Sequence, residues 1–323
     1  MEQGKKISGF SKLSKRKKLK WIVENFFKDP ELVMKQLVRY WYQNEEQQNL
    51  IDGFSENTIS NFVLPYGVAP NFLINGRVYA VPMVTEESSV VAAASSAAKF
   101  WMERGGIATR VVDYKKVGHI HFLWNGPLAL LEMLMPLVED CLRTEAISIT
   151  EKMELRGGGV LDMCLKDFSD QEPNLYQLFV TFDTCNSMGA NFINSLLESF
   201  ACSLCRFIET SESIPEEYRS IQIVMSILSN YTPECLVQAV VSCPVEELGE
   251  VSGLRASEFA EKFALAVRIA QFDTYRASTH NKGIFNGIDA VVVATANDFR
   301  AIEAGGHTFA SKSGTYKSLS QCE

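Results

Sequence analysis

The spacing of apolar positions predicts two kinds of local structure in the first hundred residues. Apolar side chains recur with a helical period over residues 19–53. Asn75-Gly76 then separates two short apolar runs in NFLINGRVYAVPM, a pattern typical of a β-hairpin with a type I′ turn. Residues 88–98 are rich in Ser and Ala and are followed by Gly105-Gly106, which predicts a helix packed closely against another backbone.

A different pattern occupies the middle of the chain. Alternating and amphipathic stretches follow one another in the order β-α-β-β-α-β, which is the order of a ferredoxin-like split unit. The strands are expected over residues 119–124, 159–167, 176–184 and 221–227, and the helices over residues 127–142 and 189–209. The earlier mixture of helix and strand resumes after residue 230, so this unit is expected to be an insertion.

These patterns predict an α+β fold with a discontinuous large domain. We expect a large mixed helix/sheet domain over residues 1–107 and 229–323, and an inserted ferredoxin-like, nucleotide-binding domain over residues 108–228. A length of 323 residues with 46% hydrophobic residues suits two domains with substantial cores. A further helix is expected over residues 256–275.

The segment RASTHNKGIFNGIDAVVVATANDFRAIEAG, residues 276–305, places polar side chains at both ends of an apolar run. We predict a buried strand over residues 289–295 within it. Lys282 lies among small and apolar residues, where a buried ammonium group requires a partner. Asp298 follows the predicted strand, and a return of the chain could bring it to Lys282. A cation held in this way stabilises an oxyanion that develops on a carbonyl group.

Two other motifs allow both a structural and a functional interpretation. Glu86-Glu87 precede a predicted helix, where acidic residues complement the helix dipole, and residue type alone favours this capping role. Glu87 could instead serve as a general acid beside apolar neighbours. NSMGAN, residues 186–191, joins a strand to a helix whose free N–H groups suit a pyrophosphate. The alternative is a tight turn in which Gly189 supplies an unusual φ angle.

Charge and composition exclude several classes of function. A net charge of −8 argues against general affinity for nucleic acid. The first twenty residues contain a run of basic side chains. We interpret this run as the solvated beginning of a helix, slightly in preference to a docking patch for a phosphorylated ligand. This run consists of Lys5, Lys6, Lys12, Lys15, Arg16, Lys17, Lys18 and Lys20. No apolar stretch reaches membrane-spanning length, and no hydrophobic signal region follows Met1, so no membrane association is expected.

The cysteine and histidine residues bear on the cellular compartment and on metal binding. The eight cysteines are scattered among apolar residues, which is typical of free thiols in a cytoplasmic protein rather than of a disulfide framework. His119 and His121 alternate on one strand face without a third ligand, and His280 and His307 lack partners at metal-ligand spacing. We therefore expect no metal site.

The blocks PYGVAPNFLINGRVYAVPMVTEESSVVAAAS, MGANFIN, SCPVEEL and RASTHNKGIFNGIDAVVVATANDFRAIEAG occur in register along the chain. Together they resemble class II 3-hydroxy-3-methylglutaryl-coenzyme A (HMG-CoA) reductases of the bacterial type, from about Gly9 to the C-terminus. The resemblance implies an enzyme that links HMG-CoA to mevalonate and coenzyme A through two hydride transfers with NADH or NADPH. It also implies a homodimer that can assemble further.

The matched motifs imply roles for individual residues. Lys282 is expected to polarise the reacting carbonyl group, Glu87 to exchange protons at the reacting oxygen, and Asp298 to hold and tune Lys282. The remaining expectations concern binding: Ser89, Arg276 and Asn286 for the HMG moiety, and Lys12 for coenzyme A. The cofactor turn is matched by Asn186, Met188, Gly189, Ala190 and Asn191.

The chain departs from the family pattern at three places. Asn186 stands where the family usually has Asp, which puts cofactor affinity or preference in question. Ser11 stands where a basic residue is common, and Lys12 is expected to substitute for it. Family members continue beyond the equivalent of Glu323 into a mobile flap with a catalytic His, so we expect the chain to be truncated. An alternative function is a catalytically impaired paralogue that binds coenzyme A or a dinucleotide.

Overall fold

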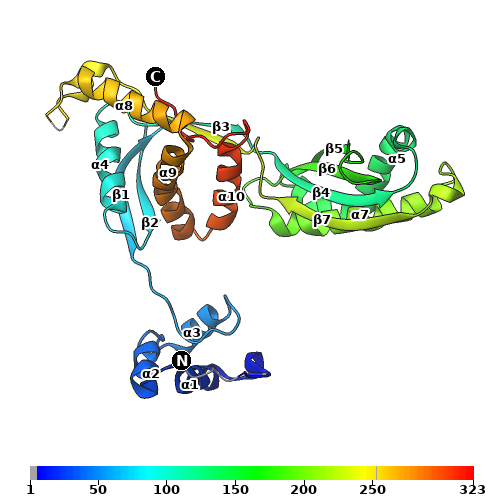
Figure 1. Cartoon of the computed structure of the whole chain (residues 1–323), viewed down its shortest axis with the longest axis horizontal. Coiled ribbons are helices and arrows are strands. Elements are labelled where there is room, and N and C mark those ends of the chain that lie inside the picture. The colour runs from blue at the N-terminus through cyan, green and yellow to red at the C-terminus, as the bar shows by residue number, and fades with distance from the viewer. Residues whose placement is uncertain (1–5, 252) are drawn as a thin grey trace. The chain divides into compact units, whose positions relative to one another are not determined.

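The computed structural model describes residues 6–251 and 253–323, and the chain divides into two compact units between Tyr66 and Gly67 (Figure 1). The N-terminal unit contains a 3-10 turn, η1 (Phe10–Lys12), and helices α1 (Lys15–Phe26), α2 (Pro30–Val38) and α3 (Glu45–Asp52). The helical period over residues 19–53 therefore corresponds to three helices. The breaks occur where Asp29 and Asn44 cap new helices by accepting hydrogen bonds from Leu32 N and Gln47 N.

A hairpin opens the second unit. Strands β1 (Tyr66–Ile74) and β2 (Arg77–Val84) form a two-stranded sheet, and Asn75 and Gly76 between them have φ angles of 48° and 81°. Both positive angles are those that a type I′ turn requires, so the predicted hairpin is confirmed. Helix α4 (Val90–Met102) follows and ends as predicted at the glycine pair, where the N–H of Gly106 donates to Trp101 O at 2.8 Å.

The four-stranded antiparallel sheet in the middle of the chain has the strand order β5-β6-β4-β7. Its strands are β4 (Lys116–Trp124), β5 (Gly159–Asp167), β6 (Leu175–Asp183) and β7 (Ile221–Ser229). The connecting helices are α5 (Leu128–Glu145), α6 (Ile147–Glu154) and α7 (Ala190–Thr210), with the 3-10 turn η2 (Glu216–Tyr218) before β7. This order and orientation confirm the predicted ferredoxin-like unit, to which the structure adds α6.

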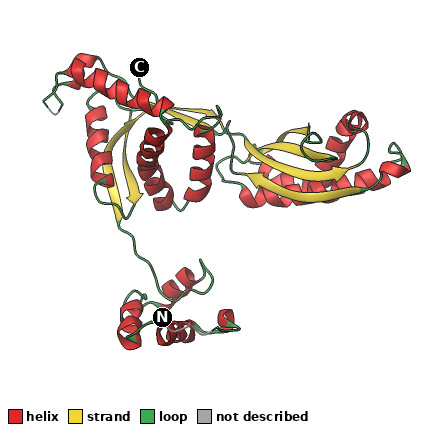
Figure 2. Cartoon of the chain, viewed as in Figure 1, coloured by secondary structure: helices red, strands yellow, loops and turns green. Residues whose placement is uncertain are grey.

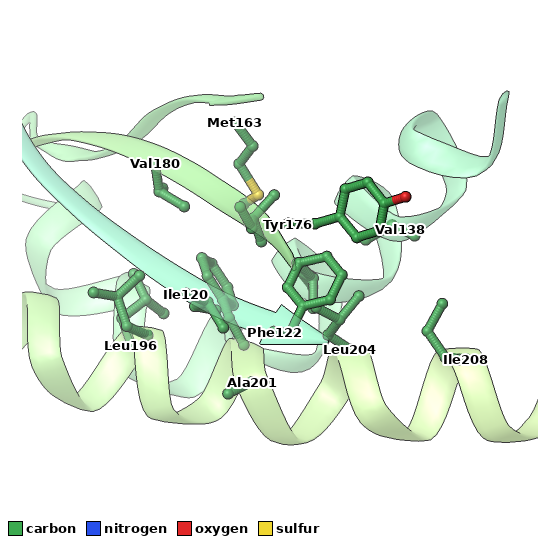
Figure 3. Packing of buried hydrophobic residues seen from close by; sticks show 14 of the residues in the cluster. Ile120, Phe122, Val138, Met163, Tyr176, Val180, Leu196, Ala201, Leu204 and Ile208 are labelled. Atoms are coloured by element: carbon green, nitrogen blue, oxygen red, sulfur yellow. The ribbon is translucent and has the colours of Figure 1, made fainter. Parts of the chain in front are cut away.

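One face of this sheet builds the main hydrophobic core. Ile120 and Phe122 on β4 point toward Leu204 and Ile208 on α7, and Val138 of α5 completes this part of the cluster (Figure 3). All five side chains are at most 2% exposed. From Gly118 to Trp124, buried positions alternate with partly buried ones along β4, which gives one apolar face as period-2 patterning predicts.

The chain enters and leaves this unit through adjacent segments. Strand β3 (Ala108–Asp113) precedes β4, strand β8 (Leu236–Val240) follows β7, and the two pair antiparallel in a separate two-stranded sheet. The predicted domain limits at residues 108 and 228 stay a prediction, because the division into compact units falls at Tyr66–Gly67.

The C-terminal part is helical and corrects one prediction. After the 3-10 turn η3 (Val245–Leu248), helices α8 (Ala256–Phe272), α9 (Thr274–Ala294) and α10 (Phe299–Ala310) follow one another. The predicted strand over residues 289–295 is wrong, because most of it continues helix α9. Ala277, Asn281 and Phe285 are buried at four-residue spacing, which is a helical period.

Helix α9 packs against the hairpin. Ala290 of α9 forms a small buried cluster with Ala69 of β1 and Met83 of β2, and Val90 and Val91 of α4 pack against it. Figure 2 shows the hairpin strands beside helices α4 and α9. This cluster positions the candidate site described next.

Candidate active site

Glu87 and Lys282, which are 195 positions apart in sequence, form an ion pair in the structure. Lys282 Nζ donates a hydrogen bond to Glu87 Oε2 at 2.6 Å. Glu87 lies in the turn between β2 and α4, and Lys282 lies in the middle of α9, so the packing of α9 against the hairpin brings them together. The side chains of Glu87 and Lys282 are 46% and 62% exposed. The predicted burial of Lys282 is therefore wrong, because α9 presents this side chain on its surface.

Two of the predicted binding residues share helix α9 with Lys282. Successive residues turn by about 100° around the axis of a helix. Viewed along this axis, Asn286 therefore lies about 40° from Lys282, and Arg276 lies about 120° from Lys282 in the same direction. Arg276 is exposed and Asn286 half-buried. Exposed Ser89 adds a hydroxyl two residues after Glu87, and it begins α4 in a left-handed conformation with a φ of 73°. These groups together suit an oxygen-rich, anionic ligand.

Asn281, immediately before Lys282, is fully buried and was not identified from the sequence. Its Nδ2 donates to Lys317 O at 2.9 Å, and its Oδ1 accepts from Leu319 N at 2.9 Å. His280 Nε2 lies 2.6 Å from Ser320 Oγ in the same segment. The C-terminal segment thus fixes α9 next to Lys282. Asn281 could have been found from the sequence, because it falls at the four-residue spacing of Ala277 and Phe285, where a polar side chain needs hydrogen-bond partners.

Asp298 does not pair with Lys282 in this chain, which corrects a prediction. Its Oδ1 caps α10 by accepting from Arg300 N at 3.1 Å and Ala301 N at 3.2 Å, and it lies 3.5 Å from Arg300 Nε. The reason is geometric: the helical stretch from Lys282 to Ala294 rises about 18 Å, which carries the chain away from Lys282.

The NSMGAN turn connects β6 to α7 with a fixed backbone. Gly189 has a φ of 79°, and a Cβ atom there would lie 2.3 Å from Thr184 Cγ2. Thr184 Oγ1 donates to Ser187 O at 2.7 Å, and Ser187 Oγ donates to Thr184 O at 2.8 Å. No side chain caps the first turn of α7 among the described residues. The turn therefore presents free N–H groups at Ala190 and beyond, which suits a phosphate group.

The other predicted side chains of this turn face solvent. Asn186, Met188 and Asn191 are exposed, and the Met188 side chain is 45% exposed. The left-handed conformation at Gly189 also confirms the structural interpretation of the motif, so the tight turn and the uncapped helix start occur together.

Comparisons with known proteins identify the family. The family model of hydroxymethylglutaryl-coenzyme A reductase matches residues 16–322. The chain belongs to the hydroxymethylglutaryl-coenzyme A reductase family. The Archaeoglobus fulgidus 3-hydroxy-3-methylglutaryl-coenzyme A reductase is 34% identical over 320 residues, which cover 98% of this chain and 68% of that protein. A probable reductase from Borreliella burgdorferi is 32% identical over 325 residues, covering 99% of this chain and 68% of that protein.

Solved structures agree in fold. The Streptococcus pneumoniae HMG-CoA reductase superposes with a TM-score of 0.74 and 37% identity, covering 98% of this chain and 81% of that chain. A class II structure from the same organism, bound to NADPH in open conformations, has a TM-score of 0.74 and 37% identity, with coverages of 97% and 81%. The predicted α+β fold and family are thus confirmed, and the family uses NAD(P)H. Membership also favours the reductase over the binding-only paralogue.

Other parts of the described chain add less to the site. Lys12 is exposed in η1, near a hollow whose lining includes Lys15 and Lys18. Lys15 is already paired with Asp52 at 2.6 Å. Lys5 of the basic run lies outside the described residues. Within residues 6–251 and 253–323, no three metal-ligating side chains cluster, and no helix is long and apolar enough to cross a membrane.

One partly buried carboxyl group on α9 has a raised pKa. Burial raises the pKa of Asp289, on α9, to about 6, and the neighbouring Glu303 carboxyl of α10 adds to the rise. Asp289 Oδ1 is buried and has no hydrogen-bond partner among the described residues. The folded state therefore holds a proton that the unfolded chain releases at lower pH.

We predict that Asp289→Asn removes a pH-dependent loss of stability. The folded pKa lies above the unfolded value, so the free energy of unfolding should fall as pH rises from about 4 to 6 and stay level above that. After discounting for solvent screening, the effect should be about 1 kcal/mol. Urea unfolding at pH 4.5 and pH 7 (roughly the two sides of this window) measures it. Exposed Asp170→Asn is the matched control, and an Asp289→Asn variant with the wild-type pH dependence would contradict the assignment.

Proposed function

We propose that this chain catalyses the NAD(P)H-dependent reduction of HMG-CoA to mevalonate and coenzyme A, or the reverse reaction. The observation that carries the proposal is the contact of 2.6 Å between Lys282 and Glu87. An ammonium group and a carboxyl group that are both accessible can act on the same oxygen atom, the first by charge and the second by proton exchange.

In the proposed mechanism Lys282 binds the carbonyl oxygen of the thioester and later that of the aldehyde. The ammonium group stabilises the negative charge that grows on this oxygen as the carbonyl carbon is reduced. Glu87, hydrogen-bonded to the same ammonium group, exchanges a proton at that oxygen. Asn281 holds the helix on which Lys282 lies, so it acts as a positioning residue. The role of Asp298 in tuning Lys282 is proposed from the motif resemblance alone, since its carboxylate caps α10 in this structure.

The substrate-binding residues follow from their chemistry. The Arg276 guanidinium matches the distal carboxylate of the HMG moiety by paired hydrogen bonds. Ser89 and Asn286 supply a hydroxyl and an amide for the remaining oxygens. Lys12, in the basic run of the N-terminal unit, is proposed to contact coenzyme A.

The NSMGAN turn is proposed to hold the cofactor. The left-handed Gly189 leaves no room for a Cβ atom, and the uncapped start of α7 offers N–H groups, so these residues fit a pyrophosphate. Met188, Ala190 and Asn191 surround that position. NADH or NADPH supplies the hydride when bound. We propose residues 108–228 as the nucleotide-binding domain and residues 1–107 with 229–323 as the HMG-CoA-binding domain.

A homodimer, able to assemble further, and a cytoplasmic location complete the proposal. Large apolar side chains of the second unit are widely exposed, and such surfaces mark sites of protein association. Examples are Val68 at 53%, Val78 at 52%, Phe272 at 71% and Tyr275 at 90%. Tyr275 precedes Arg276 directly, so a partner that covers it would also approach the proposed substrate site. The eight free cysteines are consistent with a reducing compartment.

We predict that Lys282→Ala slows hydride transfer by roughly 100- to 1,000-fold, because it removes charge stabilisation that the transition state needs most. Binding of HMG-CoA should change much less. Single-turnover oxidation of NAD(P)H and equilibrium binding of HMG-CoA separate the two effects. The matched control is Lys262→Ala, an exposed lysine on α8. Wild-type turnover in Lys282→Ala would refute the catalytic role.

We also predict that Asn186→Asp shifts cofactor preference toward NADH. A carboxylate near the adenosine ribose accepts hydrogen bonds from a free 2′-hydroxyl and repels a 2′-phosphate, so the ratio of NADH to NADPH affinity should rise by about tenfold. Fluorescence titration with each cofactor measures it. Asn174→Asp, which adds the same charge in the β5–β6 turn, is the control. Equal ratios in Asn186→Asp and wild type would place residue 186 away from the cofactor.

A further inference from the structure

Lys116 and Cys235 form an unusual contact between the two segments through which the chain enters and leaves the four-stranded unit. Lys116 Nζ lies 2.9 Å from Cys235 Sγ, and the bond is partly buried. Lys116 is the first residue of β4, and Cys235 directly precedes β8. The proposed reductase mechanism uses neither residue.

The backbones on both sides of this contact are held in place. Lys116 is in register with Phe182 of β6, and Leu236, next to Cys235, is in register with Asp113 of β3. The neighbouring residues are also paired, since Lys115 Nζ lies 2.9 Å from a Glu234 carboxylate oxygen. The strand pairings on both sides therefore hold the Lys116 amine and the Cys235 thiol near each other.

We propose that Lys116 and Cys235 form a site of reversible oxidative cross-linking, with hydrogen peroxide as the oxidant. In the first step Cys235 Sγ attacks one peroxide oxygen and the O–O bond breaks. A sulfenic acid forms on the sulfur, which is oxidised by two electrons, and the other oxygen leaves as water. In the second step the Lys116 amine, having lost its ammonium proton to water, attacks Sγ. An S–N bond forms, the S–O bond breaks, and hydroxide leaves as water with a proton from the nitrogen.

The balance is one thiol, one amine and one peroxide giving one sulfenamide and two waters. A neighbouring nitrogen captures a sulfenic acid before further oxidation, and a thiol reductant restores both side chains. The contacts of Cys235 favour capture of its sulfenic acid by an amine, whereas those of Cys141 and Cys185 do not. Cys141 Sγ faces the Glu145 carboxylate, and Cys185 Sγ donates to the backbone oxygen of Arg156, so neither contacts an amine there.

The cross-link would close the base of the inserted unit. Residues 116 and 235 bracket all four strands of the sheet, so a covalent bond between them turns the whole unit into one closed loop. Closing a long loop restricts the unfolded chain and raises the thermal unfolding midpoint. Oxidation would thus link the segment that leads into the four-stranded unit to the segment that leads out of it, with the NSMGAN turn between them in the sequence. The inference itself does not depend on the reductase assignment.

The test is peptide mapping of the full chain after treatment with hydrogen peroxide. Excess peroxide is removed with catalase, free thiols are alkylated, and the protein is digested without reductant. We expect a peptide pair that joins the segments containing Lys116 and Cys235 and lacks two hydrogen atoms relative to the sum of the separate peptides. Treatment with a phosphine reductant should release the two peptides.

Variants separate this chemistry from general thiol oxidation. Lys116→Arg and Cys235→Ser should each abolish the joined peptide, whereas Lys115→Arg, at the neighbouring lysine, should retain it. In Lys116→Arg, dimedone should label Cys235 more strongly than in wild type, because no amine captures the sulfenic acid. Lys116→Met serves the same purpose if the arginine variant does not fold. The proposal is overturned if wild type yields no joined peptide, if Cys235 accumulates as sulfinic acid, or if it pairs with another cysteine.

Discussion

The packing of helix α9 against the β1–β2 hairpin is the constraint on which the candidate active site depends. Ala290, Ala69 and Met83 form a small, closely packed cluster, so the helix lies directly on the strands. This packing brings Lys282 to the turn that carries Glu87, although the two residues are far apart in sequence. The buried Asn281 then fixes the helix to the C-terminal segment. The proposed catalytic pair is therefore a product of tertiary packing between elements that are far apart in sequence.

The four-stranded unit holds the NSMGAN turn in a fixed position. Its core is built by one apolar face of the sheet and by α5 and α7, with Phe122, Phe182 and Phe200 fully or almost fully buried. Gly118 on β4 permits the close approach of α7, since a Cβ atom there would lie 2.6 Å from Leu197 Cδ1. Helix α7 is thus pressed against the sheet, and its uncapped N-terminus keeps a fixed position at the end of β6. A rigid helix start of this kind can hold a phosphate group without a charged side chain.

The sequence predicted the sheet unit well because β4 alternates clearly between buried and less buried positions, and because Gly and Asn occur in the turns around the strands. The strand order then followed from the β-α-β-β-α-β pattern. Residues 289–295 were predicted wrongly because three consecutive Val residues favour a strand, whereas burial at four-residue spacing along α9 reflects a helix. The predicted Lys282–Asp298 pair was wrong for the same reason. A strand followed by a turn would bring the two residues together, whereas the continuing helix α9 carries the chain away from Lys282. The Glu87–Lys282 contact could not be deduced from spacing at all, although the motif resemblance assigned both residues to one site.

The central claim is that Glu87 and Lys282 act as one unit on the reacting oxygen. A double-mutant cycle with Glu87→Gln, Lys282→Ala and the double variant tests it most directly, with single-turnover reduction of mevaldehyde by NAD(P)H as the measurement. Because the two side chains are in contact, we expect strong coupling: the double variant should be about as slow as the slower single variant. Rate losses that simply multiply would show that Glu87 and Lys282 act independently, which would contradict a shared role at the reacting oxygen.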